Sequence, residues 1–112
     1  MRALKRSRVV LPEKQVEARG DRLMATLGFD IVRLSQPRAS MVTPGLPDRR
    51  YYHRARKIAV WFEAKREGGK QSFFQQDFQA MAEACGETYL VGTDDVLVAW
   101  CRQQGLIRQA II

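Results

Sequence analysis

The sequence is poor in the residues that build disulfide frameworks, soft metal sites and membrane spans. It has one histidine, two cysteines and four prolines among 112 residues. Cys85 and Cys101 lack the spacing of metal ligands, so we expect two reduced, half-buried thiols. No apolar run has the length of a membrane span, and the basic N-terminus is not followed by the apolar region of a signal peptide. These absences predict a cytoplasmic protein with no membrane partner.

Acidic residues are the scarcer charged class. The chain has 12 Asp and Glu against 19 Lys and Arg, which gives a net charge of +7 and a pI near 10.0. Twelve of the nineteen basic residues lie in three clusters of four, five and three, within residues 2–8, 49–57 and 65–70. This balance favours a polyanionic partner, nucleic acid first and a membrane surface second. A globular protein that is merely basic is the alternative.

Length and composition indicate one globular domain over residues 1–112, with a basic, flexible segment over 1–10. Apolar periodicity and breakers predict three helices: 12–27, one that Ser72 caps and Gly86 ends, and 94–103. Apolar or alternating stretches predict four strands: 29–34, 48–52, 57–64 and 88–91. The longest loop is predicted over 36–46, and a turn over 53–56. The order αβββαβα indicates an α/β fold.

Packing within these elements is also predicted. Gly20 lies inside the first helix at a cost of about 1 kcal/mol relative to alanine, which suggests close approach to another backbone. The second helix should bury a stripe of apolar residues: Phe74, Phe78, Met81, Ala82 and Cys85. The last helix should turn four residues inward: Val96, Leu97, Ala99 and Trp100. An apolar C-terminus packs on the domain or meets a partner chain: Leu106, Ile107, Ala110, Ile111 and Ile112.

The apolar strand over 57–64 ends in charged residues that are costly to bury alone. Side chains alternate along a strand, so Glu63 and Lys65 should leave on the same face. Asp48 would return to that face if the preceding strand pairs with this one as a hairpin. Two carboxylates and an ammonium at one place suit metal-dependent hydrolysis of a phosphodiester. The alternative is a surface ion pair between Glu63 and Lys65, which the short pattern alone favours.

The hydrolytic interpretation gives each group a role. Asp48, Glu63 and the backbone carbonyl of Ala64 would hold the metal, and Lys65 would orient the water or a phosphate oxygen. Ser72 and Gln75 have the spacing of a capping box at the start of the second helix. Three residues of the hairpin are aromatic and either stack on a base or pack inside: Tyr51, Tyr52 and His53.

These motifs together resemble the PD-(D/E)XK nuclease superfamily and, within it, the VRR-NUC family of virus-type replication-repair nucleases. The resemblance rests on Gly45-Leu46-Pro47-Asp48, on Glu63-Ala64-Lys65, and on Gly68-Gly69-Lys70-Gln71-Ser72-Phe73-Phe74-Gln75. It runs from about Glu13 to Trp100, nearly the whole chain. Each motif alone is weak, whereas their combination is fairly specific. Arg66-Glu67 departs from the small residue or proline that usually follows the lysine in the family.

The resemblance implies a PD-(D/E)XK restriction-endonuclease-like core. This core is αβββαβ with a C-terminal helix, and its mixed central sheet is flanked by helices. The family uses Mg²⁺ or Mn²⁺ and a further carboxylate from the first helix, often through water. Glu17 fits that position best, and Glu13 is the competitor. Family resemblance also implies that Gln75 faces the site near Lys65, in addition to closing the capping box.

The short stand-alone members that the chain resembles are phage and bacterial homodimers that cut branched DNA, especially four-way (Holliday) junctions. The expected location is therefore a bacterial cell or a phage-infected host, and no small-molecule cofactor is expected. A flap or nicking nuclease with the same site, or a non-catalytic DNA-binding module, are the alternatives. The residues expected to contact DNA are the basic and hydroxyl groups around the site: Arg49, Arg50, Arg54, Arg56, Arg66, Lys70 and Ser72.

Overall fold

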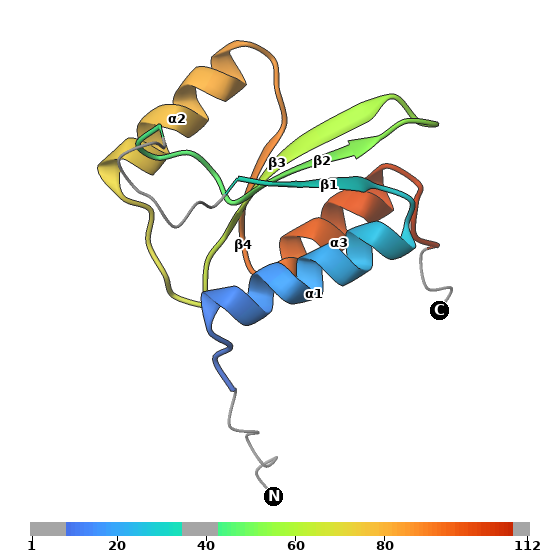
Figure 1. Cartoon of the computed structure of the whole chain (residues 1–112), viewed down its shortest axis with the longest axis horizontal. Coiled ribbons are helices and arrows are strands. Elements are labelled where there is room, and N and C mark those ends of the chain that lie inside the picture. The colour runs from blue at the N-terminus through green and yellow to red at the C-terminus, as the bar shows by residue number, and fades with distance from the viewer. Residues whose placement is uncertain (1–8, 35–42, 109–112) are drawn as a thin grey trace, which may run out of the picture.

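The computed structural model describes residues 9–34 and 43–108, which form an α/β arrangement (Figure 1). The described residues contain three helices: α1 (Glu13–Thr26), α2 (Phe73–Ala84) and α3 (Asp94–Gln103). They also contain four strands: β1 (Asp30–Arg33), β2 (Arg49–His53), β3 (Ile58–Ala64) and β4 (Tyr89–Gly92). The predicted order αβββαβα and the α/β class are confirmed. The basic N-terminal segment, most of the predicted long loop and the last four residues lie outside the described ranges.

The four strands form one mixed sheet in the order β1-β2-β3-β4. The first three strands are antiparallel neighbours, in which Arg49 pairs with Phe62. The last pair is parallel and places Glu63 opposite Val91, because α2 carries the chain across before β4 begins. Figure 1 shows α1 and α3 against one face of the sheet, and α2 away from that layer, beside β3 and β4. The predicted mixed sheet with flanking helices is therefore confirmed.

The hairpin between β2 and β3 turns one residue later than the sequence predicts. Lys57 was predicted to begin the third strand, but its φ of 57° lies in the left-handed region. Extended strands do not adopt that conformation, so Lys57 completes the turn and β3 begins at Ile58. The hairpin nevertheless has the predicted partners, and it brings the start of β2 to the end of β3.

The core lies between the sheet and the α1–α3 layer. Its largest fully buried apolar side chains come from all of these elements: Tyr51, Phe62, Met24, Leu97, Val16 and Val60. Leu106 and Ile107 pack against this core, which confirms the first alternative for these two C-terminal residues. Cys101 is fully buried, which raises the pKa of its thiol to about 11, and Cys85 is exposed. The prediction that both thiols are half-buried is therefore wrong.

Gly20 meets side chains, not another backbone. A Cβ at this position would lie 3.0 Å from Leu97 Cδ1, 3.2 Å from the Tyr51 hydroxyl and 3.3 Å from Phe62 Cε2. The glycine therefore lets α1 approach the sheet and α3 closely enough to bury these side chains. The predicted close approach exists, but its partner was predicted wrongly, since sequence periodicity does not identify what fills a neighbouring face.

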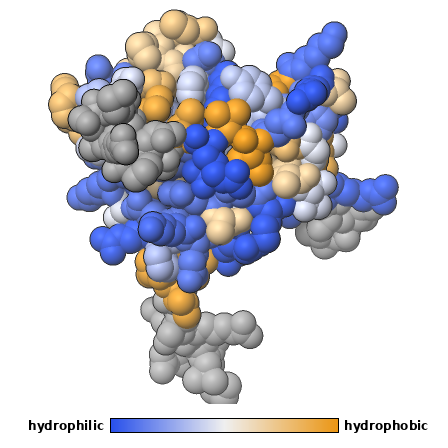
Figure 2. Space-filling model, in the orientation of Figure 1, coloured by the Kyte–Doolittle hydropathy of each residue, from blue (hydrophilic) through white to orange (hydrophobic). Residues whose placement is uncertain are grey.

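Helix α2 exposes most of the stripe that was predicted to be buried. Only Ala82 is fully buried, while Phe74 is 57% and Met81 is 56% exposed. Phe78 is the residue that docks the helix, with its ring 5.3 Å from Trp61 and 6.2 Å from Tyr89. The periodicity of α2 is helical as predicted, but no other described element covers its remaining apolar face. Figure 2 shows hydrophobic residues at the surface over α2 and the neighbouring sheet.

Helix α3 follows the predicted inward pattern with one exception. Leu97 and Trp100 are buried and Val96 is partly buried, whereas Ala99 is exposed. Cys101 takes the inward position instead, because it follows Leu97 by four residues on the same helical face. Within the described ranges, none of the helices is long and apolar enough to cross a membrane.

Candidate active site

Glu63 is the central residue of a polar cluster at the C-terminal end of β3. Its side chain is fully buried, and its Oε1 accepts hydrogen bonds from the Tyr89 hydroxyl at 2.6 Å and from Gln71 Nε2 at 3.2 Å. Its other carboxylate oxygen, Oε2, has no hydrogen-bond partner among the described residues, with only the Lys65 ammonium 3.5 Å away. Buried carboxylate oxygens are rarely left without a hydrogen-bond donor, so this oxygen is available to a water molecule or a cation.

Lys65 lies on the same face as Glu63, as the strand alternation predicts. Its ammonium donates to Gln75 Oε1 at 2.9 Å, and the same oxygen accepts the Ser72 backbone N–H at 2.8 Å. The Ser72 hydroxyl in turn accepts the Gln75 backbone N–H at 3.2 Å, which completes the capping box. Gln75 therefore has both predicted roles: it caps α2 and contacts Lys65.

Asp48 immediately precedes β2 and reaches the end of β3. Its Oδ2 accepts the backbone N–H of Ala64 at 2.8 Å, which confirms that the hairpin returns this carboxylate to the Glu63–Lys65 end. The charge of Asp48 also acts on two groups from different elements: it raises the pKa of Glu17 on α1 and that of Tyr89 on β4. Asp48 thus lies within electrostatic reach of side chains on both α1 and β4.

Tyr89 remains a hydrogen-bond donor to Glu63. Burial raises the pKa of its hydroxyl, and the hydrogen bond to Glu63 and the charge of that carboxylate raise it further. A tyrosine held in its protonated form keeps Glu63 Oε1 occupied. The arrangement leaves Oε2 as the oxygen of Glu63 that has no donor.

Glu17 is the α1 carboxylate that the structure brings to Asp48. Burial raises its pKa, the neighbouring Asp48 raises it further, and Arg49 partly offsets both effects. Arg49 NH2 lies 3.2 Å from Glu17 Oε1. Of the two candidates from the sequence, Glu17 is therefore the one with a described link to Asp48, whereas Glu13 lies in the first turn of α1.

Arg49 is buried and does not lie on a DNA-facing surface. It is 6% exposed, and its guanidinium donates to both carboxylate oxygens of Asp21, at 2.9 Å from Nε and 3.1 Å from NH2. It also donates to the backbone carbonyl of Asp48 at 2.9 Å. Burial alone would lower the pKa of Arg49, but the hydrogen bond and charge of Asp21 raise it overall. This arginine positions Glu17 and the chain at Asp48 instead of contacting a ligand.

The other basic residues predicted to contact DNA differ in their exposure and in their partners. Arg50 is mostly buried, with its guanidinium 4.3 Å from the Trp61 ring centre and 3.6 Å from Glu87. Arg54 is exposed and pairs with Asp30 at 2.7 Å, and Arg56 donates to the backbone carbonyl of Gln104. Three of the predicted contact residues lie exposed in the segment between β3 and α2: Arg66, Lys70 and Ser72.

Of the two alternatives for the hairpin aromatics, packing inside is confirmed for Tyr51 and His53. Tyr51 is fully buried and donates to Asp21 Oδ1 at 2.8 Å. His53 Nε2 lies 3.0 Å from the Leu27 carbonyl, and its ring is packed edge-on against Phe29. Both point to the α1 side of the sheet, because they alternate with Tyr52, which is exposed on the opposite face.

Asp21 is the site-supporting residue that the sequence analysis missed. It is buried in α1 and binds both Arg49 and Tyr51. The signal was present, since Asp21 directly follows Gly20 at the edge of the apolar stripe, where a carboxylate requires a partner. It also follows Glu17 by four residues, which places both acids on one face of the helix.

The three predicted carboxylates do not converge into a metal-binding group. Among the residues that the structure describes, no three Asp, Glu, His or Cys side chains are arranged to hold a metal ion. Instead, Asp48 binds the Ala64 amide, Glu63 binds Tyr89, and Glu17 binds Arg49. The three side chains still suit a hard divalent cation chemically, because carboxylate oxygens are the ligands that such ions prefer. One of these oxygens, Glu63 Oε2, has no hydrogen-bond donor among the described residues.

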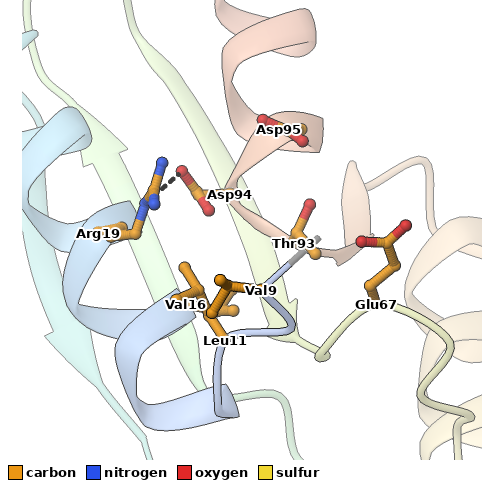
Figure 3. Close-up of a pocket in the computed structure, with 8 residues that line it drawn as sticks. All are labelled: Val9, Leu11, Val16, Arg19, Glu67, Thr93, Asp94 and Asp95. Carbon is orange, nitrogen blue, oxygen red and sulfur yellow. Dashed lines mark hydrogen bonds and ion pairs between the residues drawn. The ribbon is translucent and has the colours of Figure 1, made fainter. Parts of the chain in front are cut away.

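A pocket of about 270 Å³ lies beside this cluster and is distinct from it (Figure 3). Its lining comes from α1, α3 and the segments before them and after β3: Val9, Leu11, Val16, Arg19, Glu67, Thr93, Asp94 and Asp95. Arg19 and Asp94 form an ion pair at 3.1 Å across it. None of the residues predicted for the active site lines this pocket.

We expect Glu17→Gln to raise the melting temperature at about pH 7.5, with a gain that shrinks near pH 4. The pKa of Glu17 is raised in the folded protein above its reference value of 4.5 for the unfolded chain. The contribution of Glu17 to stability is therefore fully present below the unfolded-state pKa, and it is lost as the pH rises through the folded-state pKa. At neutral pH its charge therefore opposes Asp48 and Asp21. Thermal unfolding across this pH range measures the effect, with Glu13→Gln as the matched control on the same helix. A gain that is equal at both pH values would contradict the assigned repulsion.

Comparison with protein-family models, with curated proteins and with solved structures finds no match for the chain. What this protein does is therefore inferred from its own residues and contacts.

Proposed function

We propose that the chain is a Mg²⁺- or Mn²⁺-dependent endonuclease that hydrolyses phosphodiester bonds in branched DNA. One observation carries this proposal: Glu63 and Lys65 lie side by side at the buried end of β3, where Asp48 docks on the Ala64 amide. A surface ion pair, the alternative from sequence, does not explain a fully buried Glu63 whose Oε2 has no hydrogen-bond donor. Buried charges in such an arrangement are typical of functional sites.

Asp48, Glu63 and the backbone carbonyl of Ala64 would hold the cation, with Glu17 acting through water. The bound ion would lower the pKa of a water molecule and neutralise charge on the phosphate. Lys65 is oriented by Gln75 and Glu63, so its ammonium is positioned to hold a phosphate oxygen or the attacking water. The N-terminus of α2 carries the partial positive charge of the helix dipole beside this lysine.

The substrate and assembly belong to the same proposal. A net charge of +7 attracts a polyanion, and exposed Arg66 and Lys70 lie near the start of α2. One chain supplies one such site, while symmetric resolution of a four-way junction requires two cuts, so we propose a homodimer. A cytoplasmic location, in a bacterial cell or a phage-infected host, is part of this proposal.

A non-catalytic DNA-binding module is the second candidate. It is favoured by one observation: the carboxylates of Asp48, Glu63 and Glu17 each bind a different protein group, and no three-ligand group is present in the described ranges. Such a module would keep the basic surface and bind DNA without cutting it. A flap or nicking nuclease would use the same chemistry as the first proposal and differ only in the DNA that it accepts.

Cleavage of a labelled four-way junction, a flap and a linear duplex in Mg²⁺ or Mn²⁺ tests these candidates together. We expect paired symmetric nicks in the junction and no product in a chelator. Asp48→Asn and Glu63→Gln should lower the rate about 100-fold or more, because each removes a charge that the reaction needs. Asp77→Asn, an exposed carboxylate on α2, is the control that should retain full activity.

Three outcomes would change the proposal. Equal cutting by the wild type, Asp48→Asn and Glu63→Gln would show that the reaction occurs elsewhere. Tight binding of all three DNAs without any cutting would favour the DNA-binding module. Cutting of the flap alone would keep the site and replace the junction as substrate. Sedimentation of the free protein tests the homodimer separately.

A further inference from the structure

We propose that Phe73 and Phe74 form a platform on which an unpaired base of the substrate stacks, next to the cleavage site. This inference rests on the proposed function and adds to it a preference for DNA with an unstacked nucleotide at the site. The two phenylalanines occupy the first two positions of α2, directly after the Ser72 cap. They take the place of the hairpin aromatics, of which Tyr51 and His53 point inward.

The two rings are exposed to an unusual degree. Phe73 is 75% and Phe74 is 57% exposed, and their centres lie 5.8 Å apart at an interplanar angle of 72°. A large apolar side chain left in water forfeits about 2 kcal/mol or more that burial would contribute. Two adjacent rings that remain uncovered are therefore a marker of a binding surface.

The platform is held rigidly by its backbone. The capping box between Ser72 and Gln75 closes the first turn of α2. The loop before Asp48 packs on the same turn: a Cβ at Gly45 would lie 2.1 Å from the Phe74 carbonyl oxygen. The backbone of Phe74 is thus in contact with the segment that leads to Asp48, and a bound base would need little reorganisation of either.

The platform adjoins the charged groups of the site. Gln75, whose Oε1 accepts a hydrogen bond from the Lys65 ammonium, directly follows Phe74. The Cα atoms of Phe74 and Gln75 are therefore about 3.8 Å apart. A phosphate held at Lys65 and a base resting on Phe73 or Phe74 would then both lie at the first turn of α2. In a continuous duplex both faces of each base are already covered by stacking, whereas an unpaired base offers a free face to an aromatic ring.

Charge favours a nucleotide as the occupant of this surface. Lys70 is exposed just before the start of α2, where the helix N-terminus adds further positive potential. A nucleotide presents two groups that complement this surface: an anionic phosphate for the positive charge and a flat aromatic base for the rings.

The test compares two DNAs that differ only at the nucleotide of interest. One duplex carries a short unpaired arm with 2-aminopurine at its first unpaired position, and in the other that position is paired. With Ca²⁺ in place of Mg²⁺, we expect the wild type to change the 2-aminopurine fluorescence in the arm only. The double variant Phe73→Leu/Phe74→Leu should bind the arm-bearing DNA about tenfold or more weakly, because stacking is lost while apolar side chains are retained.

Controls separate stacking from general apolar contact. Met81→Leu changes another exposed apolar residue of α2, about 10.5 Å along the helix from Phe74, and should leave both affinities unchanged. Phe73→Tyr/Phe74→Tyr keeps the rings and should bind like the wild type. If the double leucine variant bound the arm-bearing DNA as tightly as the wild type does, the platform would be overturned. A changed oligomeric state in that variant would overturn it as well, by assigning the surface to a second copy.

Failure of this inference is distinguishable from failure of the proposed function. Ring-dependent binding without cleavage in Mg²⁺ would refute hydrolysis alone. Cleavage that depends on Glu63 but is unaffected by loss of both rings, on DNA with or without an unpaired arm, would refute the platform alone.

Discussion

Asp21→Ala lowers the free energy of unfolding by about 3–5 kcal/mol, because it leaves the buried guanidinium of Arg49 without its carboxylate partner. The Tyr51 hydroxyl, fully buried beneath α1, loses its acceptor in the same substitution. Denaturant unfolding measures the loss. The control is Asp30→Ala, whose ion pair with Arg54 is closer in distance, at 2.7 Å, but exposed to solvent.

The control should cost no more than about 1 kcal/mol, since exposed ion pairs contribute little. Similar losses for Asp21→Ala and Asp30→Ala would contradict the importance of burial at Arg49. A second consequence of the Asp21 substitution concerns the site, because Arg49 also contacts Glu17 and the Asp48 carbonyl. The proposed nuclease activity should therefore fall in Asp21→Ala even at temperatures where the protein remains folded.

Gly45→Ala destabilises the protein by about 3 kcal/mol and should remove most of the proposed nuclease activity. The glycine has φ of +79°, where a side chain is strained, and an added Cβ would lie 2.1 Å from the Phe74 carbonyl oxygen. A backbone atom cannot turn away as a flexible side chain can, so the loop and the first turn of α2 must separate. That separation moves Asp48 away from the helix that holds Lys65 through Gln75.

Gly68→Ala is a matched control for this prediction. Gly68 has the same φ of +79°, but a Cβ there would meet no atom within 4 Å. It should therefore cost only the backbone strain of about 1 kcal/mol. Thermal unfolding and the junction assay of both variants separate the two effects. Equal losses in Gly45→Ala and Gly68→Ala would show that the contact with α2 contributes nothing.

Local sequence signals predicted the elements and part of the site. The capping box of Ser72 and Gln75 depends only on a three-residue spacing, and strand alternation alone placed Glu63 and Lys65 on one face. The return of Asp48 to the end of β3 followed from a hairpin between adjacent strands. Such features were accessible because each is determined by residues that are near in sequence.

The errors concern contacts between distant segments. Arg49 and Arg50 are adjacent arginines that the sequence does not distinguish. In the structure, the register of β2 turns Arg49 toward Asp21 and Arg50 toward Trp61. The apolar stripe of α2 was correctly recognised, but its burial depended on how far the helix lies from the sheet. Whether carboxylates from α1, β2 and β3 share one cation is likewise decided by tertiary geometry, which spacing along the chain does not encode.

The side-chain oxygen Oε1 of Gln75 closes the cap of α2 and holds the Lys65 ammonium at the same time. Fraying of the first helical turn and loss of the lysine orientation are thus one event, with a single opening equilibrium. The site would switch off by local melting of a few residues long before the sheet unfolds. Conversely, a phosphate that engages both Lys65 and the start of α2 would slow the opening of that turn. The geometry of the proposed site is therefore tied to the helix–coil balance of α2.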